Sequence, residues 1–231
     1  MLKRAKLPRA LAALLPLVVG LGSVGALRAT PIVAVSMGTT TPNGANSWLA
    51  TGLTAGWEFS LSSAITVVDL GVFDNSQANG LGEAHAVGIW NTSGTLLVSG
   101  TVPAGTAGTL INSFFYVGVT STVLPAGTYI IATEYDTSNT DPMYGNLTSS
   151  NFSTASPVTW IQDEAGGNGV NVLTFPTFTS PPQEDGFFGP NFEFTTSVSA
   201  SPEPPSGWLL GSVLAAMAAG AGYRKLRKSR A

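Results

Sequence analysis

Residues 56–73 read GWEFSLSSAITVVDLGVF, and this stretch decides the fold class. Trp57, Phe59 and Leu61 alternate with other residues. A period of two is typical of a β-strand that buries one face. No segment of residues 31–199 has the sustained apolar period of three to four that an amphipathic helix produces. The sequence therefore predicts an all-β domain.

Short runs rich in β-branched and aromatic residues, separated by turn residues, continue along the chain. The predicted strands are residues 56–61, 65–73, 84–90, 96–102, 113–119, 127–135, 158–163, 171–175 and 191–195. Asn91-Thr92-Ser93-Gly94 separates two of these runs and predicts a hairpin turn with Gly94 at positive φ. Many short antiparallel strands at this spacing favour a β-sandwich of the jelly-roll kind.

The chain begins with the features of a secretory signal peptide. Four basic residues lie among the first nine, an apolar stretch covers residues 10–27, and small residues follow. This order predicts a signal peptide over residues 1–29. An uncleaved membrane anchor is the alternative.

A second set of targeting features occupies residues 201–231. Pro202, Glu203 and Pro204 come first, and an apolar segment covers residues 206–223. The apolar segment is just long enough for a transmembrane helix. The basic residues after it should stay cytoplasmic under the positive-inside rule. They are Arg224, Lys225, Arg227, Lys228 and Arg230.

This tail resembles the PEP-CTERM sorting signal of exopolysaccharide-producing Gram-negative bacteria. The resemblance rests on Pro202-Glu203-Pro204, on Trp208-Leu209-Leu210-Gly211 and on the terminal Arg/Lys cluster. It implies that an exosortase, a membrane-embedded cysteine transpeptidase, is a partner and cleaves near Pro202-Glu203-Pro204. The protein would be anchored in the cytoplasmic membrane before processing, and would reach the outer envelope or the extracellular matrix afterwards. A plain C-terminal anchor with a Pro-rich spacer is the alternative.

Charge and cysteine content exclude several function classes. All 10 Lys and Arg lie before residue 29 or after residue 223, and all 13 Asp and Glu lie between these positions. A domain without Lys or Arg cannot engage a phosphate backbone, so nucleic-acid binding is excluded. The chain has no Cys, which excludes disulfides, thiol nucleophiles and thiolate zinc sites. Residues 31–199 are the right length for one domain.

Packing and turn residues of this domain resemble those of a family of uncharacterised bacterial exported β-domains. The likeness rests on Leu70-Gly71-Val72-Phe73-Asp74, Gly80-Leu81, Val87-Gly88-Ile89-Trp90, Gly94-Thr95-Leu96-Leu97 and Gly189-Pro190-Asn191-Phe192. Members of that family occur in surface proteins, some of them beside carbohydrate-active modules. The likeness predicts a shared fold but says nothing about an activity.

Two long irregular stretches, residues 74–83 and 136–157, hold the candidate binding residues. Asp74, Asn75 and Glu83 offer hard oxygen ligands for Ca²⁺, the only cofactor that the sequence suggests. Their spacing matches no known calcium loop, so solvated acidic loops without an ion are the alternative. Further hard ligands are Asp69, Asn79, Asp136 and Asp141. The pair Asp163-Glu164 is expected to be simply solvated.

His85 is the only histidine. Its position at the start of a predicted strand favours a half-exposed structural imidazole over a general base or a metal ligand. One histidine without a nucleophile elbow argues against a hydrolase triad. Tyr135 and Tyr144 flank the second long stretch and are expected to be exposed, where they could stack on sugar rings. Trp57, Trp90 and Trp160 lie in strand patterns and are expected in the core.

These features favour a non-catalytic structural or adhesive protein of the cell surface. A carbohydrate-binding module for exopolysaccharide is the nearest alternative. A more distant alternative is an envelope glycosidase, which needs two carboxylates beside an aromatic-lined cleft. Two pairs are candidates, and the sequence selects neither: Glu134 and Asp136 share one strand face, and Asp74 and Glu83 bracket the first long stretch.

Overall fold

The computed structural model describes residues 29–37, 47–74, 79–144, 152–167, 171–180 and 187–196. These residues form strands, turns and bends, and none of them belongs to a helix. Within these ranges there is accordingly no helix that could span a membrane. The predicted signal peptide, apart from Ala29, and the whole predicted sorting signal lie outside the described residues.

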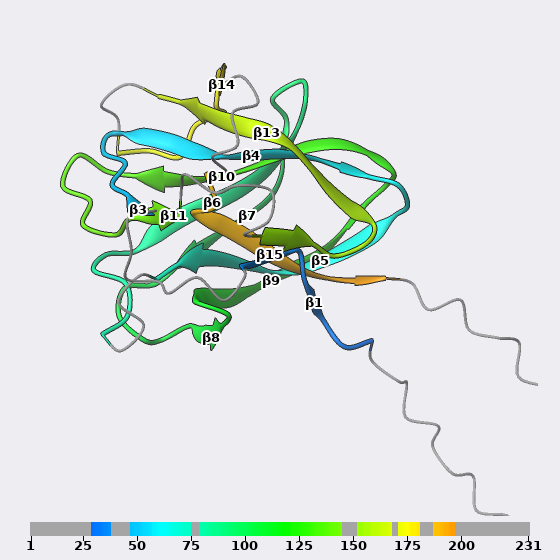
Figure 1. The fold of residues 1–231 in the computed structure, drawn as a ribbon, viewed down its shortest axis with the longest axis horizontal. Coiled ribbons are helices and arrows are strands. Elements are labelled where there is room, and N and C mark those ends of the chain that lie inside the picture. The colour runs from blue at the N-terminus through cyan, green and yellow to red at the C-terminus, as the bar shows by residue number, and fades with distance from the viewer. Residues whose placement is uncertain are drawn as a thin grey trace, which may run out of the picture.

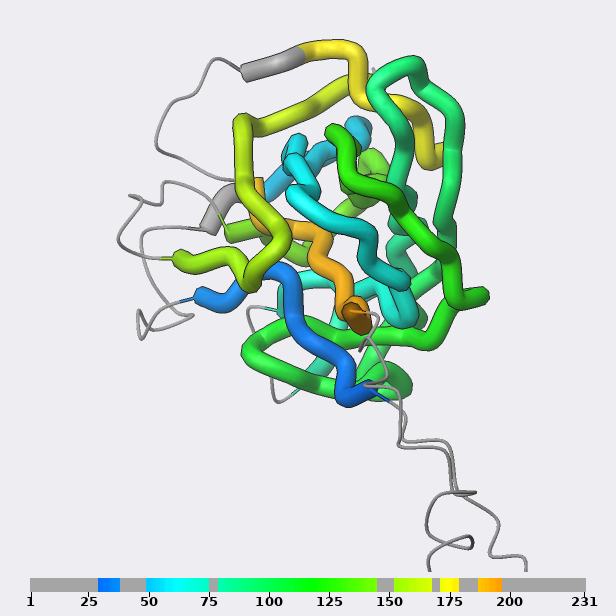
Figure 2. The backbone as a smooth tube through the Cα atoms, turned by 90° about the vertical axis from the view of Figure 1, so that its right-hand side faces the viewer, coloured from blue at the N-terminus to red at the C-terminus, as the bar shows by residue number. Residues whose placement is uncertain are grey.

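Five strands form the first antiparallel sheet, in the order β1-β15-β5-β9-β8 (Figure 1). Their bounds are β1 Ile32–Val33, β15 Pro190–Thr196, β5 Ile65–Phe73, β9 Phe114–Leu124 and β8 Thr109–Ile111. The first and last described strands, β1 and β15, pair with each other. Both ends of the described domain therefore leave it on the same side, as the tube drawing also shows (Figure 2).

Six strands form the second antiparallel sheet, in the order β14-β13-β4-β10-β6-β7. Their bounds are β14 Phe178–Ser180, β13 Val158–Gly166, β4 Leu53–Leu61, β10 Gly127–Tyr135, β6 His85–Asn91 and β7 Leu96–Val102. Two short ladders complete the fold. They join β11 Met143–Tyr144 to β3 Ser47–Trp48, and β12 Phe152–Thr154 to β2 Val35–Met37.

An aromatic core lies between the two sheets. Trp57 and Phe59 of β4 are fully buried, as their alternation predicts. The Trp57 ring stacks on Phe192 of β15 in the other sheet, with centroids 5.9 Å apart and an interplanar angle of 19°. The Trp57 Nε1 donates a hydrogen bond to the Pro190 carbonyl at 2.9 Å, so the one polar atom of this side chain is satisfied. The facing sides of the two sheets thus bury the apolar half of each alternating strand.

The hairpin turn at Asn91 is confirmed. The Asn91 Oδ1 accepts hydrogen bonds from Ser93 N, Ser93 Oγ and Thr95 N, at 3.2, 2.8 and 2.8 Å. Gly94 follows at a φ of 83°, a conformation that a side chain would strain. The turn joins β6 to β7 and fixes the register of both strands.

The predicted strand over residues 171–175 is wrong. This stretch has no strand structure and crosses the outer face of the second sheet. Phe175 packs edge-on against Trp90 of β6, with ring centroids 6.2 Å apart. The Thr174 amide donates to Thr54 Oγ1 of β4 at 3.2 Å. The apolar residues of this stretch therefore cover a sheet, and they do not form one face of a strand.

Candidate functional site

Strand pairing brings two loops together at one end of the second sheet. Strands β6 and β10 are antiparallel neighbours, with Val87 opposite Thr133. The start of β6 therefore lies against the end of β10, and the segments before His85 and after Tyr135 leave the sheet at the same end. This arrangement brings ligand atoms of Glu83, His85 and Asp141 within 4.8 Å of one another. We call these three residues the acidic–histidine cluster.

His85 is the centre of the cluster and has two hydrogen-bond partners. Its Nδ1 lies 3.0 Å from the Glu134 carbonyl oxygen, and its Nε2 lies 3.0 Å from Asp141 Oδ2. A carbonyl and a carboxylate both only accept hydrogen bonds. Both ring nitrogens must therefore carry a proton when both bonds form, and His85 is then an imidazolium paired with Asp141.

The pKa values of the pair move apart, as an ion pair requires. Burial alone would lower the pKa of His85, but the hydrogen bonds with Asp141 and the Glu134 carbonyl raise it above 6.5. Burial alone would raise the pKa of Asp141, but hydrogen bonds from His85, Gly82 and Glu83 lower it below 3.8. Both shifts favour the charged forms.

The prediction that the His85 imidazole is half-exposed is wrong, because this side chain is only 1% exposed. The Tyr135 ring packs on it, with ring centroids 5.3 Å apart, and Asp141 covers the Nε2 side. A buried charge needs a partner to offset its lost hydration. Asp141 supplies that partner from 56 residues away in the sequence.

Backbone contacts hold the Asp141 carboxylate in place. Its Oδ1 accepts from the Gly82 amide at 2.8 Å, and its Oδ2 accepts from the Glu83 amide at 3.1 Å. Asn139 fixes the backbone behind it, because its Oδ1 accepts from the Asp141 amide at 2.9 Å. The Asn139 Nδ2 donates to the Ala50 carbonyl at 2.7 Å. The 79–85 segment and the 136–141 segment are thus tied together through one carboxylate.

Two further carboxylates border the cluster. Burial, followed by the charge of Asp136, raises the pKa of Glu83, and the two side chains are in hydrogen-bond contact. Burial also raises the pKa of Glu134, on which His85 and Asp136 act in opposite directions. The like charges of Glu83 and Asp136 repel each other, and this repulsion favours the protonated form of Glu83.

Three buried oxygen atoms of these neighbours have no hydrogen-bond partner. They are Glu83 Oε1, Glu134 Oε1 and the hydroxyl of Tyr135. Tyr135 is fully buried, and burial together with the charge of Asp141 raises its pKa. Buried polar atoms without a partner are rare and need an explanation. For Glu83 Oε1, the one of the three that belongs to the cluster, a bound ion or water would be such an explanation.

The predicted calcium ligands Asp74, Asn75 and Glu83 are not all in one place in the described structure. Glu83 belongs to the acidic–histidine cluster, whereas Asp74 does not. Asp74 is 2% exposed at the end of β5, and its amide donates to the Ser113 carbonyl at 2.8 Å. Asn75 lies outside the described residues, so this three-ligand set stays a prediction.

Sugar stacking by Tyr135 and Tyr144 is not possible in this conformation, and their expected exposure is wrong. They are 0% and 3% exposed. The alternation of β10 turns Tyr135 inward, on the same side as Ile131. The Tyr144 ring packs edge-on against Phe73 at 5.2 Å. Both rings are core residues.

Two of the three tryptophans expected in the core are buried, Trp57 and Trp90, and Trp160 is half-buried. Asp163 and Glu164, expected to be solvated, are also buried. Asp163 Oδ1 accepts from the Phe187 amide at 2.7 Å, and Glu164 Oε1 accepts from Gln162 Nε2 at 3.1 Å. Strand β13 continues to Gly166, and this continuation places both acids within the sheet.

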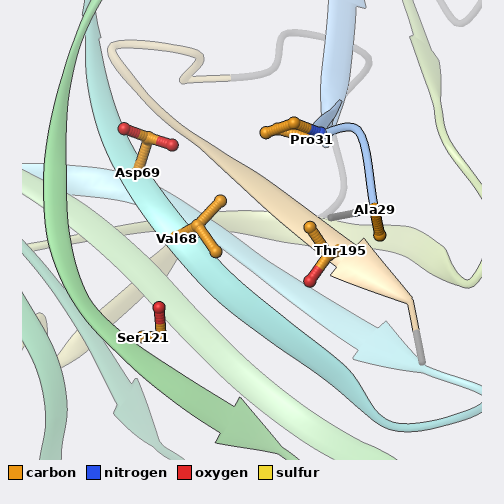
Figure 3. Close-up of a pocket in the computed structure, with 6 residues that line it drawn as sticks. All are labelled: Ala29, Pro31, Val68, Asp69, Ser121 and Thr195. Carbon is orange, nitrogen blue, oxygen red and sulfur yellow. The ribbon is translucent and has the colours of Figure 1, made fainter. Parts of the chain in front are cut away.

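An open depression of about 500 Å³ lies on the outer face of the first sheet (Figure 3). Asp69 is its only charged lining residue. The other lining residues are Ala29, Pro31, Val68, Ser121 and Thr195. A single carboxylate among small side chains offers no nucleophile–base pair, so we place the candidate site at the acidic–histidine cluster.

The sequence identified the residue types of this cluster but not their grouping. Glu83, Asp136 and Asp141 were each recognisable as hard ligands, and His85 as a lone imidazole. Their grouping depends on the pairing of β6 with β10, two strands that β7, β8 and β9 separate in the chain. No local pattern reports such a pairing.

Comparison with known proteins identifies no relative of the chain. No family model matches it, and neither the curated proteins nor the solved structures contain a match.

Proposed function

We propose that this protein is exported and then processed at its C-terminus by an exosortase. It is held in the cytoplasmic membrane by residues 206–223 until cleavage near Pro202-Glu203-Pro204, and it then stays in the outer envelope or extracellular matrix. The order of basic, apolar and small residues at the N-terminus supports export. The order of Pro-Glu-Pro, apolar segment and basic cluster at the C-terminus supports processing.

The β-domain between these signals has a structural or adhesive role without catalysis, on a jelly-roll-like β-sandwich. One observation carries this part of the proposal: both nitrogens of the only histidine already have partners at 3.0 Å. A general base needs a free nitrogen within reach of its substrate. His85 is buried and tied to Asp141, so it joins two loops. The two antiparallel sheets that face each other across an aromatic core support the sandwich.

The carbohydrate-binding alternative loses its main support. Tyr135 and Tyr144, the two rings expected to stack on sugars, are both in the core. The large apolar side chains that are exposed among the described residues include one aromatic, Phe178 of β14, at 63%. One ring does not form the aromatic platform of a sugar site.

Intact mass of the mature protein tests export and processing. The full chain is expressed in a host with a working exosortase and in a matched strain without it. We expect the first host to yield a protein that lacks its N-terminal signal and every residue after the Pro202-Glu203-Pro204 region. The second strain should retain Ala231 and keep the protein in the membrane fraction. A product that ends at Ala231 in the first host would contradict processing.

A separate assay tests the absence of catalysis. Purified protein is incubated with the exopolysaccharide of its host, and new reducing ends are counted. We expect no release above the buffer control. Sugar release that Glu134→Gln abolishes would instead support a glycosidase.

A further inference from the structure

We propose that Glu83, His85 and Asp141 bind one divalent transition-metal ion of the Zn²⁺ or Mn²⁺ type, through His85 Nε2 and carboxylate oxygens. This site shares Glu83 with the predicted Ca²⁺ ligands and does not include Asp74. It does not depend on export or C-terminal processing, so its failure would leave the proposed function untouched.

The distance between the two most fixed ligand atoms fits a bound ion. Ligands about 2.0–2.1 Å from Zn²⁺ that subtend an angle of 90–110° are about 2.8–3.4 Å apart. His85 Nε2 and Asp141 Oδ2 are 3.0 Å apart. Glu83 completes the group within 4.8 Å. Its side chain is only partly buried, so a small rotation can bring it closer.

The hydrogen bond at the other nitrogen of His85 is the kind that metal ligands make. A metal-binding imidazole usually donates its second N–H to a carbonyl or carboxylate, which fixes the tautomer and the ring orientation. His85 Nδ1 lies 3.0 Å from the Glu134 carbonyl. With a proton on Nδ1, the Nε2 lone pair faces Asp141. Either a second proton or a cation must then separate Nε2 from the carboxylate.

An unpartnered oxygen points independently to a missing ligand. Glu83 Oε1 belongs to a cluster residue, is buried and has no hydrogen-bond partner. Buried polar atoms without a partner are rare and need an explanation. A cation bound by the cluster would satisfy this oxygen atom.

The charge and the donor set select the class of ion. Two carboxylates of the three ligands attract a cation, and no Lys or Arg exists between Ala29 and Tyr223 to compete for them. One imidazole nitrogen with carboxylates suits Zn²⁺ and Mn²⁺, whereas Ca²⁺ takes oxygen ligands almost exclusively. His85 therefore favours a transition metal over calcium.

Because His85 is the only histidine, its ring nitrogens can be observed without assignment. The test uses the full chain without a histidine tag, labelled with [¹⁵N]histidine, in detergent and EDTA, and then with ZnCl₂. We expect two protonated nitrogens in EDTA. With Zn²⁺, one nitrogen should lose its proton and shift to a metal-bound position, while the other keeps its proton.

Thermal melts of the same samples test affinity and specificity. At 100 times Kd, Zn²⁺ should raise the melting temperature by roughly 5–10 °C, whereas CaCl₂ and NaCl at equal ionic strength should not. His85→Gln and Asp141→Asn should each weaken Zn²⁺ binding by at least about tenfold. Asp69→Asn makes the same chemical change on the other sheet and should leave binding unchanged.

Three results would overturn the proposal. They are unchanged histidine nitrogen signals with Zn²⁺, an equal melting shift with Ca²⁺, and an undiminished Zn²⁺ shift in His85→Gln. Should His85→Gln fail to fold, Glu83→Gln tests the same site from its more exposed ligand. The wild-type nitrogen spectrum needs no variant and decides whether His85 binds the ion.

Discussion

Asp141 and His85 form the one ion pair of side chains among the described residues. Both residues are buried, and removal of one partner leaves the other charge uncompensated. We expect Asp141→Asn to lower the free energy of unfolding by about 3–5 kcal/mol in EDTA, measured by urea denaturation. The double variant with His85→Gln should cost less than the sum of the single variants, because the second change removes the stranded charge. Additive costs would show that the two side chains do not stabilise each other.

A second residue-scale prediction concerns pH. Asp69 of β5 and Glu193 of β15 lie directly opposite each other. Burial raises the pKa of both, and the charge of Asp69 raises the pKa of Glu193 further. An acid with a raised pKa binds protons more tightly in the folded state than in the unfolded state. This pair therefore adds stability as the pH falls through the folded pKa values, and the gain is complete below the unfolded values of about 3.9 and 4.3.

Asp69→Asn removes the repulsion between the two carboxylates. At pH 7 we expect it to stabilise the fold by about 0.2–1 kcal/mol, the range for opposed cross-strand charges. At pH 3.5 both wild-type acids are largely protonated, so the variant should gain almost nothing. Melting temperatures of both proteins at the two pH values check this. An equal gain at both would contradict an electrostatic cause.

At the scale of single elements, the centre of β4 depends on a glycine. A Cβ at Gly56 would lie 2.0 Å from the Ile131 carbonyl oxygen of β10, a backbone atom that cannot move aside. We expect Gly56→Ala to destabilise the fold by at least about 3 kcal/mol. Gly118→Ala is the control, because its Cβ would meet Asp69 at an ordinary 3.6 Å. Urea denaturation should show that Gly118→Ala changes the free energy of unfolding by no more than about 0.5 kcal/mol.

The segment over residues 171–177 acts as a cover for the second sheet. Phe175 lies against Trp90, which is 3% exposed. Phe175→Ala should admit water to Trp90 and shift the tryptophan fluorescence to longer wavelength. It should also lower the free energy of unfolding by roughly 1–3 kcal/mol. Val172→Ala in the same segment should change neither value, because Val172 is 63% exposed. Unchanged fluorescence in Phe175→Ala would show that other residues shield the indole.

Local patterns predicted several strands together with their bounds. Strands β5, β7 and β10 match their predicted ranges at both ends, because turn residues bound runs of β-branched and aromatic residues there. Strand β13 extends three residues beyond its prediction, to Gly166. Its last residues, Asp163 to Gly166, are polar or small, so composition cannot distinguish them from a loop. Their strand structure comes from pairing with β4 and β14.

The acidic–histidine cluster could not be predicted for the same reason: it depends on pairing between strands that are distant in the sequence. Glu83 and Asp141 are 58 residues apart in the chain, and their contact requires the order β4-β10-β6 in the sheet. Tyr135 ends a strand whose side chains alternate between two faces, and the alternation alone does not show which face turns toward the core. The pairing with β4 decides this, because Ile131 lies opposite Trp57 and both face the core. Tyr135 is on the same face as Ile131 and is therefore buried.

At the scale of the whole molecule, charge segregation governs the response to salt. Twelve carboxylates lie between Glu58 and Glu193 without any Lys or Arg, so the folded domain repels itself. Salt screens this repulsion, since the Debye length falls from about 30 Å at 0.01 M to about 3 Å at 1 M. In EDTA, which removes bound metal, we expect the melting temperature of the full chain to rise between 0.01 and 0.5 M NaCl. The rise should disappear at pH 3.5, where most carboxylates are neutral.

A melting temperature that is independent of NaCl at pH 7 would show that the carboxylates lie too far apart to interact through water. In that case the ion pair of His85 and Asp141 would be the main electrostatic contribution to the fold.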